Sequence, residues 1–511
     1  VELNPVAVLS FTGFALILME TCRCLEFSQK KLEDQKRRAD SYDLVGDFRK
    51  WANWVQEKAR KEIGSFYPEE KGETLVGYLW ARTINCHNPS CGGEIPLLMN
   101  LWLSNKTGKK IALRLIPNSS HASIKFELVK GNRIDFDASK GTVSRAVATC
   151  PICNATIPAN KVRKTAQQKK MGHKMLVKVY VSNKSGKSYK LVTQKDIKAF
   201  KKAEESLEEN EDMIPHEKLP PIGTLGFRIN RYGMGEWSDL YNPRQLLSIV
   251  IFAQKIKDAY KTMIERGMDR EYAKGLTTYL ALALDRLANY NCSLCLWQDA
   301  GEFIAQAFTQ GQSLPMRWDY FEVNPFSNLT GGFSGAVDWI CRVIKHCSLV
   351  SDSPATVNQG NATKLQYRDN YFDAVITDPP YYDNVPYADL SDFFYVWLKR
   401  ILRDLYPNLF STPLTPKSME IIQEPMRHEK NPRKAKSFFE SKLAESFQEI
   451  HRVLKRNGIA CIMFAHKSAA AWETLIDAML KSGLVTTASW PVHTERSARL
   501  RYHHSAALAS S

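Results

Sequence analysis

The spacing of apolar residues after Asn242 predicts two consecutive helices in the middle of the chain. Asn242 followed by Pro243 is typical of a helix start, and apolar residues then recur on one helical face up to Gly267. A second helix is predicted from Asp269, with leucines such as Leu284 on its apolar face. We interpret this pair as a structural helical layer.

From about Gly332 the pattern changes to alternating helices and strands. The predicted helices are Ala336 to Ile344, a long one that includes Phe438 and Leu454, and Trp472 to Leu480 before Gly483. The predicted strands are Ala355 to Asn358, Phe372 to Thr377, Ile459 to Phe464 and Val485 to Trp490. Such alternation indicates an α/β fold with a doubly wound parallel sheet.

Composition excludes several classes of protein. With 44% hydrophobic and 24% charged residues over 511 positions, the chain is neither disordered, collagen-like nor a small disulfide scaffold. The apolar stretch Val6 to Met19 is interrupted by polar residues and is shorter than a spanning helix, so no membrane segment is predicted. Eleven sparse cysteines favour a reducing cytoplasm.

The net charge of +16 is concentrated in one segment. Lys161 to Lys202 contains fourteen Lys and Arg residues against the single acid Asp196, a local net charge of +13. Such a cluster predicts contact with the phosphates of DNA, and a solvated lysine-rich face is the alternative. The candidate phosphate-binding residues are Lys161, Arg163, Lys164, Lys169, Lys170 and Lys174. The acidic stretch Glu204 to Asp212 that follows is interpreted as a linker or flexible edge.

Two cysteine pairs have metal-ligand spacing. Cys86 and Cys91 form one pair, and Cys150 and Cys153 form the other. Four thiolates at tetrahedral spacing predict a closed structural Zn2+ site, against the alternative of four unrelated thiols. The long gap between the pairs predicts an inserted sheet around Lys109 to Ile134. The other cysteines are interpreted as small buried apolar residues.

The motif Asp378-Pro379-Pro380-Tyr381 directly follows a predicted strand, at the edge where open α/β sheets bind ligands. The exocyclic amine of adenine or cytosine is a poor nucleophile until acceptors hold its hydrogens. A carboxylate at Asp378 and the carbonyl of Pro379 supply such acceptors, and Tyr381 offers a face for stacking an extruded base. The alternative is an ordinary strand-terminating turn.

The run from Asp378 to Arg400, DPPYYDNVPYADLSDFFYVWLKR, resembles the large adenine-specific DNA methylases that contain a zinc ribbon. The resemblance extends to the cysteine pairs and to both ends of the chain. It implies S-adenosylmethionine as methyl donor, in a Rossmann-like methyltransferase sheet interrupted by a zinc ribbon and helices. The cofactor-binding positions that it implies are Glu2, Asn4, Pro5, Asn361 and Ala362.

The family also has a glycine-rich loop about twenty residues before the acid matched by Glu2, and no such segment precedes Glu2 here. We therefore expect the chain to be an interior piece of a longer protein, and the 511-residue polypeptide by itself to bind the cofactor weakly or not at all.

The resemblance divides the chain into six segments. These are residues 1–20, the start of the methyltransferase domain; 21–75, helical; 76–160, the zinc ribbon; 161–221, the basic segment and acidic linker; 222–330, the helical layer; and 331–511, the rest of the methyltransferase domain. The expected function is methylation of adenine N6 in DNA. Cytosine N4 or RNA base methylation, and a non-catalytic zinc-ribbon DNA-binding protein, are the alternatives. Partner subunits of a defence or restriction system are a further expectation.

Overall fold

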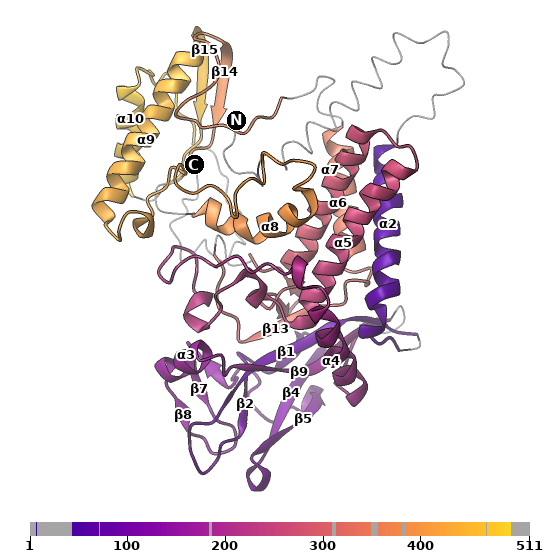
Figure 1. Cartoon of the computed structure of the whole chain (residues 1–511). Helices are drawn as coiled ribbons and strands as arrows, with labels where there is room; N and C mark the ends of the chain where they lie inside the picture. The colour runs from indigo at the N-terminus through magenta and orange to yellow at the C-terminus, as the bar shows by residue number, and fades with distance from the viewer. Residues whose placement is uncertain are drawn as a thin grey trace.

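The computed structural model describes Ala7 and residues 43–70, 72–182, 186–308, 313–348, 356–380, 385–466 and 468–491. It is a mixed α/β structure with several sheets, which confirms the predicted class (Figure 1). The doubly wound parallel sheet stays a prediction, because β14–β15 is the one parallel pair of strands that these residues form.

The largest sheet has five strands and is antiparallel. Its order is β10 (Gly186–Leu191), β9 (Gly172–Ser182), β1 (Thr74–Asn85) and β13 (Asp319–Val323), with β2 (Glu94–Leu97) paired to the end of β1. Nearly every position of β1 between its two ends is buried. The lysine-rich segment therefore supplies two strands, β9 and β10, of the main sheet.

Five helices pack beside this sheet (Figure 1). They are α2 (Leu44–Ile63), α4 (Gln194–Glu208), α5 (Pro243–Glu265), α6 (Arg270–Tyr290) and α7 (Phe333–Cys347). The Asn242 side chain caps α5, with Pro243 as its first residue, and the Asp269 side chain caps α6. The two predicted central helices and the predicted helix at Ala336 are therefore confirmed.

A buried ion pair joins α5 to the sheet. The Arg244 guanidinium donates to both carboxylate oxygens of Glu322 on β13, at 2.6 and 2.9 Å, and both side chains are fully buried. Trp80 Nε1 also donates to Glu322, at 2.7 Å. The buried positive charge of Arg244 is thus compensated by the buried carboxylate of Glu322.

Smaller sheets surround the main one. β3 (Trp102–Lys106), β4 (Lys109–Asn118) and β5 (Ser123–Lys130) form one antiparallel sheet, which confirms the predicted insertion between the cysteine pairs. Two further antiparallel sheets are formed by β6 (Val143–Ser144), β7 (Val147–Thr149) and β8 (Thr156–Ile157), and by β11 (Leu296–Gln298) and β12 (Phe303–Ala305). α3 (Ala159–Gln167) follows β8.

The C-terminal part contains the parallel pair β14 (Phe372–Thr377) and β15 (Leu454–Ile462). α9 (Pro432–Val453) and α10 (Ala469–Lys481) pack against one face of the pair, where Val375 and Ile462 contact their apolar side chains. The opposite face carries Ile376 and Ile459, which are 77% and 70% exposed. α8 (Tyr387–Leu402) lies between this part and the helical layer, against α5 and α6 (Figure 1).

Three predictions of local structure are wrong. Residues 356–358 of the predicted strand Ala355 to Asn358 form no strand, and Ala355 lies outside the described residues. Val485 to Trp490 also form no strand, and both end residues are more than 70% exposed. Glu204, Glu205 and Glu208 belong to α4 rather than to a linker, because Phe200 and Ala203 bury one face of that helix.

No helix in the described ranges combines the length and the apolar character needed to cross a membrane.

Candidate functional site

Asp378 lies immediately after β14. Thr377 closes the strand, and its carbonyl accepts a hydrogen bond of 2.9 Å from the N–H of Met463, which follows β15. The carboxyl ends of the two strands are therefore held together. Asp378 is exposed, Pro379 is buried and Pro380 is half-buried, whereas Tyr381 lies outside the described residues. The carboxylate is thus open to a ligand, on a backbone anchored by the buried proline.

A group of polar side chains near Asp378 was missed by the sequence reasoning. Tyr387 begins α8, and partial burial together with the negative charges of Asp378 and Glu420 raises the pKa of its hydroxyl. Burial also raises the pKa of Glu420. Arg427 lies 2.5 Å from Asp389 and 2.7 Å from Glu420, so it fixes these two acids beside the start of α8. Glu420 and Arg427 lie in a segment without a regular spacing of apolar residues, so the sequence gives no indication of their role.

The implied cofactor residues are only partly described. Glu2, Asn4 and Pro5 lie outside the described residues, and Ala362 is exposed. The side-chain oxygen of Asn361 accepts hydrogen bonds of 3.0 Å from both the N–H and the hydroxyl of Thr363. That oxygen is used within its own turn, whereas the assignment of Asn361 and Ala362 to the cofactor stays a prediction.

The four predicted metal ligands come together. The Sγ atoms of Cys86 and Cys153 are 3.6 Å apart, those of Cys91 and Cys150 are 3.8 Å apart, and all four lie within 4.8 Å of one another. Four sulfurs bound tetrahedrally at about 2.3 Å from Zn2+ would lie about 3.8 Å from one another. The cluster can therefore bind a metal ion.

Each cysteine pair occupies a tight turn between two strands. Cys86 and Cys91 lie between β1 and β2, and Cys150 and Cys153 lie between β7 and β8. Burial raises the pKa of Cys86 to about 12, whereas the backbone N–H of Ala155 is the main cause that lowers the pKa of Cys153 to about 7. The thiols do not all ionise readily on their own, and a bound cation would favour their ionisation.

A basic groove runs between α3 and the first cysteine turn. It has a volume of about 420 Å³. Its lining residues are Asn85, Cys86, His87, Lys161, Lys164, Thr165, Gln168 and Lys170. The α3 segment contributes positions 161, 164, 165 and 168, which share one helical face, while Val162 and Ala166 on the opposite face are buried. The cysteine cluster and the lysines of α3 therefore line one groove.

The six predicted phosphate-binding residues separate into two groups. Lys161, Lys164 and Lys170 are exposed, and within the described part of the chain they form no ion pair. Arg163 instead lies over the Tyr232 ring, Lys169 pairs with Asp239 at 3.2 Å, and Lys174 pairs with Glu94. Arg163, Lys169 and Lys174 thus contact other side chains of the protein and do not line the groove.

The remaining charge of the basic segment is also partly neutralised. Lys178 pairs with Glu70 and Asp196, and Lys190 pairs with Glu70 and Glu73. The positive charge of the segment is therefore not one continuous unpaired patch, since these lysines of β9 and β10 pair with acids nearby.

Most of the other described cysteines are buried, as predicted. Cys292, Cys295 and Cys341 are at most 1% exposed. The exceptions are Cys347, which is half-buried, and Cys461, which is exposed on the open face of β15. Cys22 and Cys24 lie outside the described residues.

Comparison of the chain with protein-family models, curated proteins and solved structures found no match.

Proposed function

We propose that this protein is an S-adenosylmethionine-dependent DNA methyltransferase that acts on the N6 amine of adenine. The observation that carries the proposal is the placement of Asp378-Pro379-Pro380 at the carboxyl end of a strand in a parallel pair, with the carboxylate exposed and the proline backbone anchored. This edge is where α/β sheets bind their ligands.

In the proposed reaction, the Asp378 carboxylate and the Pro379 carbonyl accept hydrogen bonds from the two amine hydrogens of an extruded adenine. The nitrogen lone pair is then directed away from the ring and toward the methyl donor. S-adenosylmethionine, when bound, would supply the methyl group, with its sulfur–methyl bond breaking as the N–C bond forms, and the surplus amine proton would pass to solvent. Tyr381 is proposed to stack on the base.

The cysteine cluster supports a second part of the proposal, in which Zn2+ fixes the two turns and thereby positions α3. The three unpaired lysines of the basic groove would then contact DNA phosphates. Because such contacts carry no base information, the groove holds DNA in place without choosing the target sequence. Each phosphate contact should steepen the fall of log K with log salt concentration by about one unit of slope.

The test is methyl transfer from labelled S-adenosylmethionine to DNA by the protein as its gene encodes it, followed by digestion to nucleosides. N6-methyl-2′-deoxyadenosine is the expected product, and Asp378→Asn should abolish it. Asp373→Asn, on β14 just before Asp378 and also exposed, is the matched control and should retain activity. N4-methylcytosine, or methylation confined to RNA, would contradict the proposed target.

A non-catalytic DNA-binding protein is the second candidate. The basic groove beside the cysteine cluster favours it, because binding DNA in that groove requires no S-adenosylmethionine. It predicts salt-sensitive DNA binding that Asp378→Asn leaves unchanged, with no methylated nucleoside from any DNA. Detection of Asp378-dependent product would exclude it.

A further inference from the structure

Two cysteines outside the metal-binding cluster contact each other in the core. Cys292 and Cys295 lie in the turn Cys-Ser-Leu-Cys between α6 and β11, and their Sγ atoms are 3.7 Å apart. Both residues are fully buried, at 0% exposure. Among the described residues, no further cysteine, histidine or carboxylate joins them in a group that could hold a metal ion. The turn therefore presents a pair of adjacent thiols.

The backbone of this turn has the geometry that a disulfide requires. The N–H of Cys295 donates to the carbonyl of Cys292 at 3.1 Å, which is the hydrogen bond of a β-turn. A β-turn holds the Cα atoms of its first and fourth residues within about 7 Å, and a disulfide spans about 4.4–6.8 Å between Cα atoms. Small side-chain rotations can therefore bring the two sulfurs from 3.7 Å to bonding distance.

The two thiols differ in how their protons are held. Cys295 Sγ donates to the carbonyl of Asn289 at 3.3 Å, and burial raises the pKa of Cys295 well above its ordinary value. On the other side of the turn, Arg82 Nη2 donates to Ser293 Oγ at 2.8 Å, so a guanidinium lies beside the residue that follows Cys292. Cys295 is thus the thiol that keeps its proton, and Cys292 is the sulfur that can act as a nucleophile.

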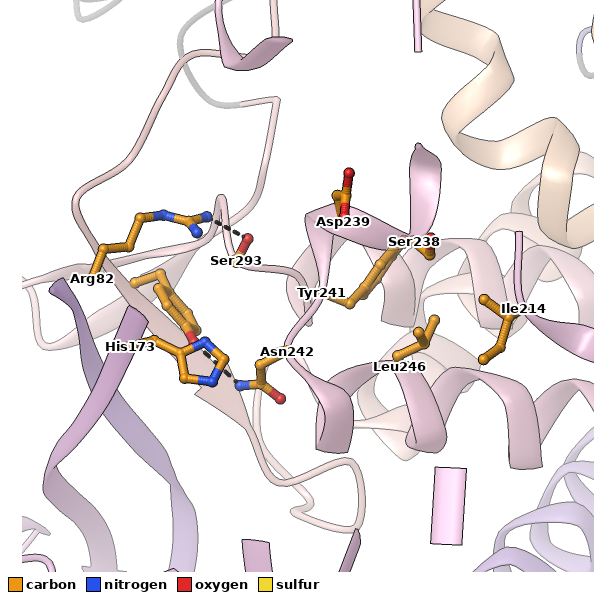
Figure 2. Close-up of a pocket in the computed structure, with 10 residues that line it drawn as sticks. Arg82, His173, Ile214, Ser238, Asp239, Tyr241, Asn242, Leu246 and Ser293 are labelled. Carbon is orange, nitrogen blue, oxygen red and sulfur yellow. Dashed lines mark hydrogen bonds between the residues drawn. The ribbon is translucent and has the colours of Figure 1, made fainter. Parts of the chain in front are cut away.

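A pocket of about 320 Å³ reaches this turn. Ser293, Arg82 and Tyr241 are among the residues that line it. Figure 2 shows the hydrogen bond from Arg82 to Ser293 at the wall of the pocket. A water-sized oxidant can enter such a space and reach the residue next to Cys292. A bulky disulfide such as oxidised glutathione cannot contact the sulfurs, because both are fully buried.

We propose that Cys292 and Cys295 are a modification site that hydrogen peroxide converts into a reversible disulfide. The spacing Cys-x-x-Cys is that of redox-active pairs, and disulfides of this kind in a reducing compartment are transient. The role of the pair does not depend on the proposed methyltransferase activity.

The reaction has two steps. The Cys292 thiolate attacks one peroxide oxygen and the O–O bond breaks, and the leaving hydroxide takes up the proton that Cys292 released. The Cys295 sulfur then attacks the Cys292 sulfenic acid, the S–O bond breaks and a second water leaves with the Cys295 proton. The two sulfurs lose two electrons, and one peroxide is reduced to two waters. A dithiol restores both thiols by thiol–disulfide exchange.

The test is peptide mapping of the full chain after treatment with hydrogen peroxide, with free thiols alkylated before digestion. Trypsin should release residues 287–317, a peptide that contains Cys292 and Cys295 and no other cysteine. We expect this peptide to carry no alkyl group and to lack two hydrogens, and dithiothreitol to reverse both changes. Oxidised glutathione at the same concentration should act slower by about tenfold or more, because the sulfurs are buried.

Cys341 is the matched control within the same sample, because it is buried to the same degree, at 1% exposure. It should be oxidised about tenfold or more slowly than the pair, since a buried thiol without this arrangement is inert. Circular dichroism recorded in parallel shows that the chain stays folded during the reaction.

Two substitutions separate the roles of the two sulfurs. Cys295→Ser should stop the reaction at a Cys292 sulfenic acid, which dimedone traps. Cys292→Ser should form neither a disulfide nor a trapped adduct at Cys295. If either variant does not fold, the comparisons in the unaltered protein decide the question. The proposal is overturned if the pair stays reduced in the folded protein, if it is oxidised only after unfolding, or if Cys341 or oxidised glutathione reacts as fast.

Discussion

The five-stranded sheet and the β14–β15 pair differ in how their apolar faces are covered. β1 is buried at nearly every interior position, and its charged neighbours Arg244 and Glu322 neutralise each other. β14 and β15 are covered by α9 and α10 on one face, and Ile376 and Ile459 remain exposed on the other. Parallel strands are ordinarily buried on both faces. The five-stranded sheet and the cysteine cluster beside it thus form a closed region, whereas Asp378 directly follows β14, a strand with an open face.

The largest expected effect concerns the closed region. Cys150→Ser removes one of four thiolates, and structural zinc in small domains contributes about 10–16 kcal/mol of apparent binding free energy at neutral pH. We expect the variant to lose stoichiometric zinc and to show the largest fall in Tm, measured by metal analysis and calorimetry. Cys341→Ser, at a buried cysteine outside the cluster, should keep its metal. One zinc per chain in Cys150→Ser would contradict the ligand assignment.

The next effect concerns the buried ion pair. Glu322→Gln leaves the Arg244 charge in the core with an uncharged partner, and breaking such a pair typically costs about 3–5 kcal/mol. Urea unfolding should show this loss. The control Asp338→Asn breaks an exposed pair with Arg49 and should cost no more than about 1 kcal/mol. Equal losses of unfolding free energy in the two variants would show that the buried pair contributes no more than the exposed pair.

A matched pair of substitutions compares the two sheets directly. Ile95→Ala, at a fully buried position of β2, should cost about 2–5 kcal/mol of unfolding free energy. Ile376→Ala, at 77% exposure on β14, should stay within about 0.5 kcal/mol. A loss above 2 kcal/mol for Ile376→Ala would show that another element covers this face in solution.

The smallest effect concerns a surface histidine of the closed region. Hydrogen bonding to Glu236 raises the pKa of His216 above its ordinary value of 6.5. The charged form is therefore favoured in the folded state, so the stabilisation is complete below pH 6.5 and is lost as the pH rises through the raised pKa. For this half-exposed group the change should be about 0.5 kcal/mol or less.

The free energy of unfolding should be measured across the pH range in which His216 loses its proton. The pH-dependent contribution should be absent in His216→Gln and present in His346→Gln. A pH dependence that is unchanged in His216→Gln would assign the effect to another group.

The features that the sequence predicts well have local causes. Asn242 and Pro243 place the start of α5 because a cap and a fixed backbone angle act within one turn. The spacing of Cys86, Cys91, Cys150 and Cys153 identified the cluster because metal ligation restricts residue type and spacing. The predicted strand Phe372–Thr377 also matches β14.

The features that it does not predict depend on contacts between distant residues. The three groove lysines differ from Lys169 and Lys174 only through Asp239 and Glu94, which lie far away in sequence. The buried hydrogen bonds of Arg82 to the Arg317 carbonyl and to Ser293 also join residues that are far apart in the sequence. The residue types from Val485 to Trp490 are typical of a strand, yet this segment forms no strand with any other described residues.

The most direct test of the account is the rate of methyl transfer as a function of DNA concentration, for the protein as its gene encodes it. Asp378→Asn should lower kcat by about 10²-fold or more, as loss of a positioned transition-state contact does, with KM for DNA unchanged. Lys161→Gln, Lys164→Gln and Lys170→Gln combined should raise KM and leave kcat close to its original value. Full kcat in Asp378→Asn, or an unchanged KM in the triple variant, would contradict the assignment of methyl transfer to Asp378 and of DNA binding to the basic groove.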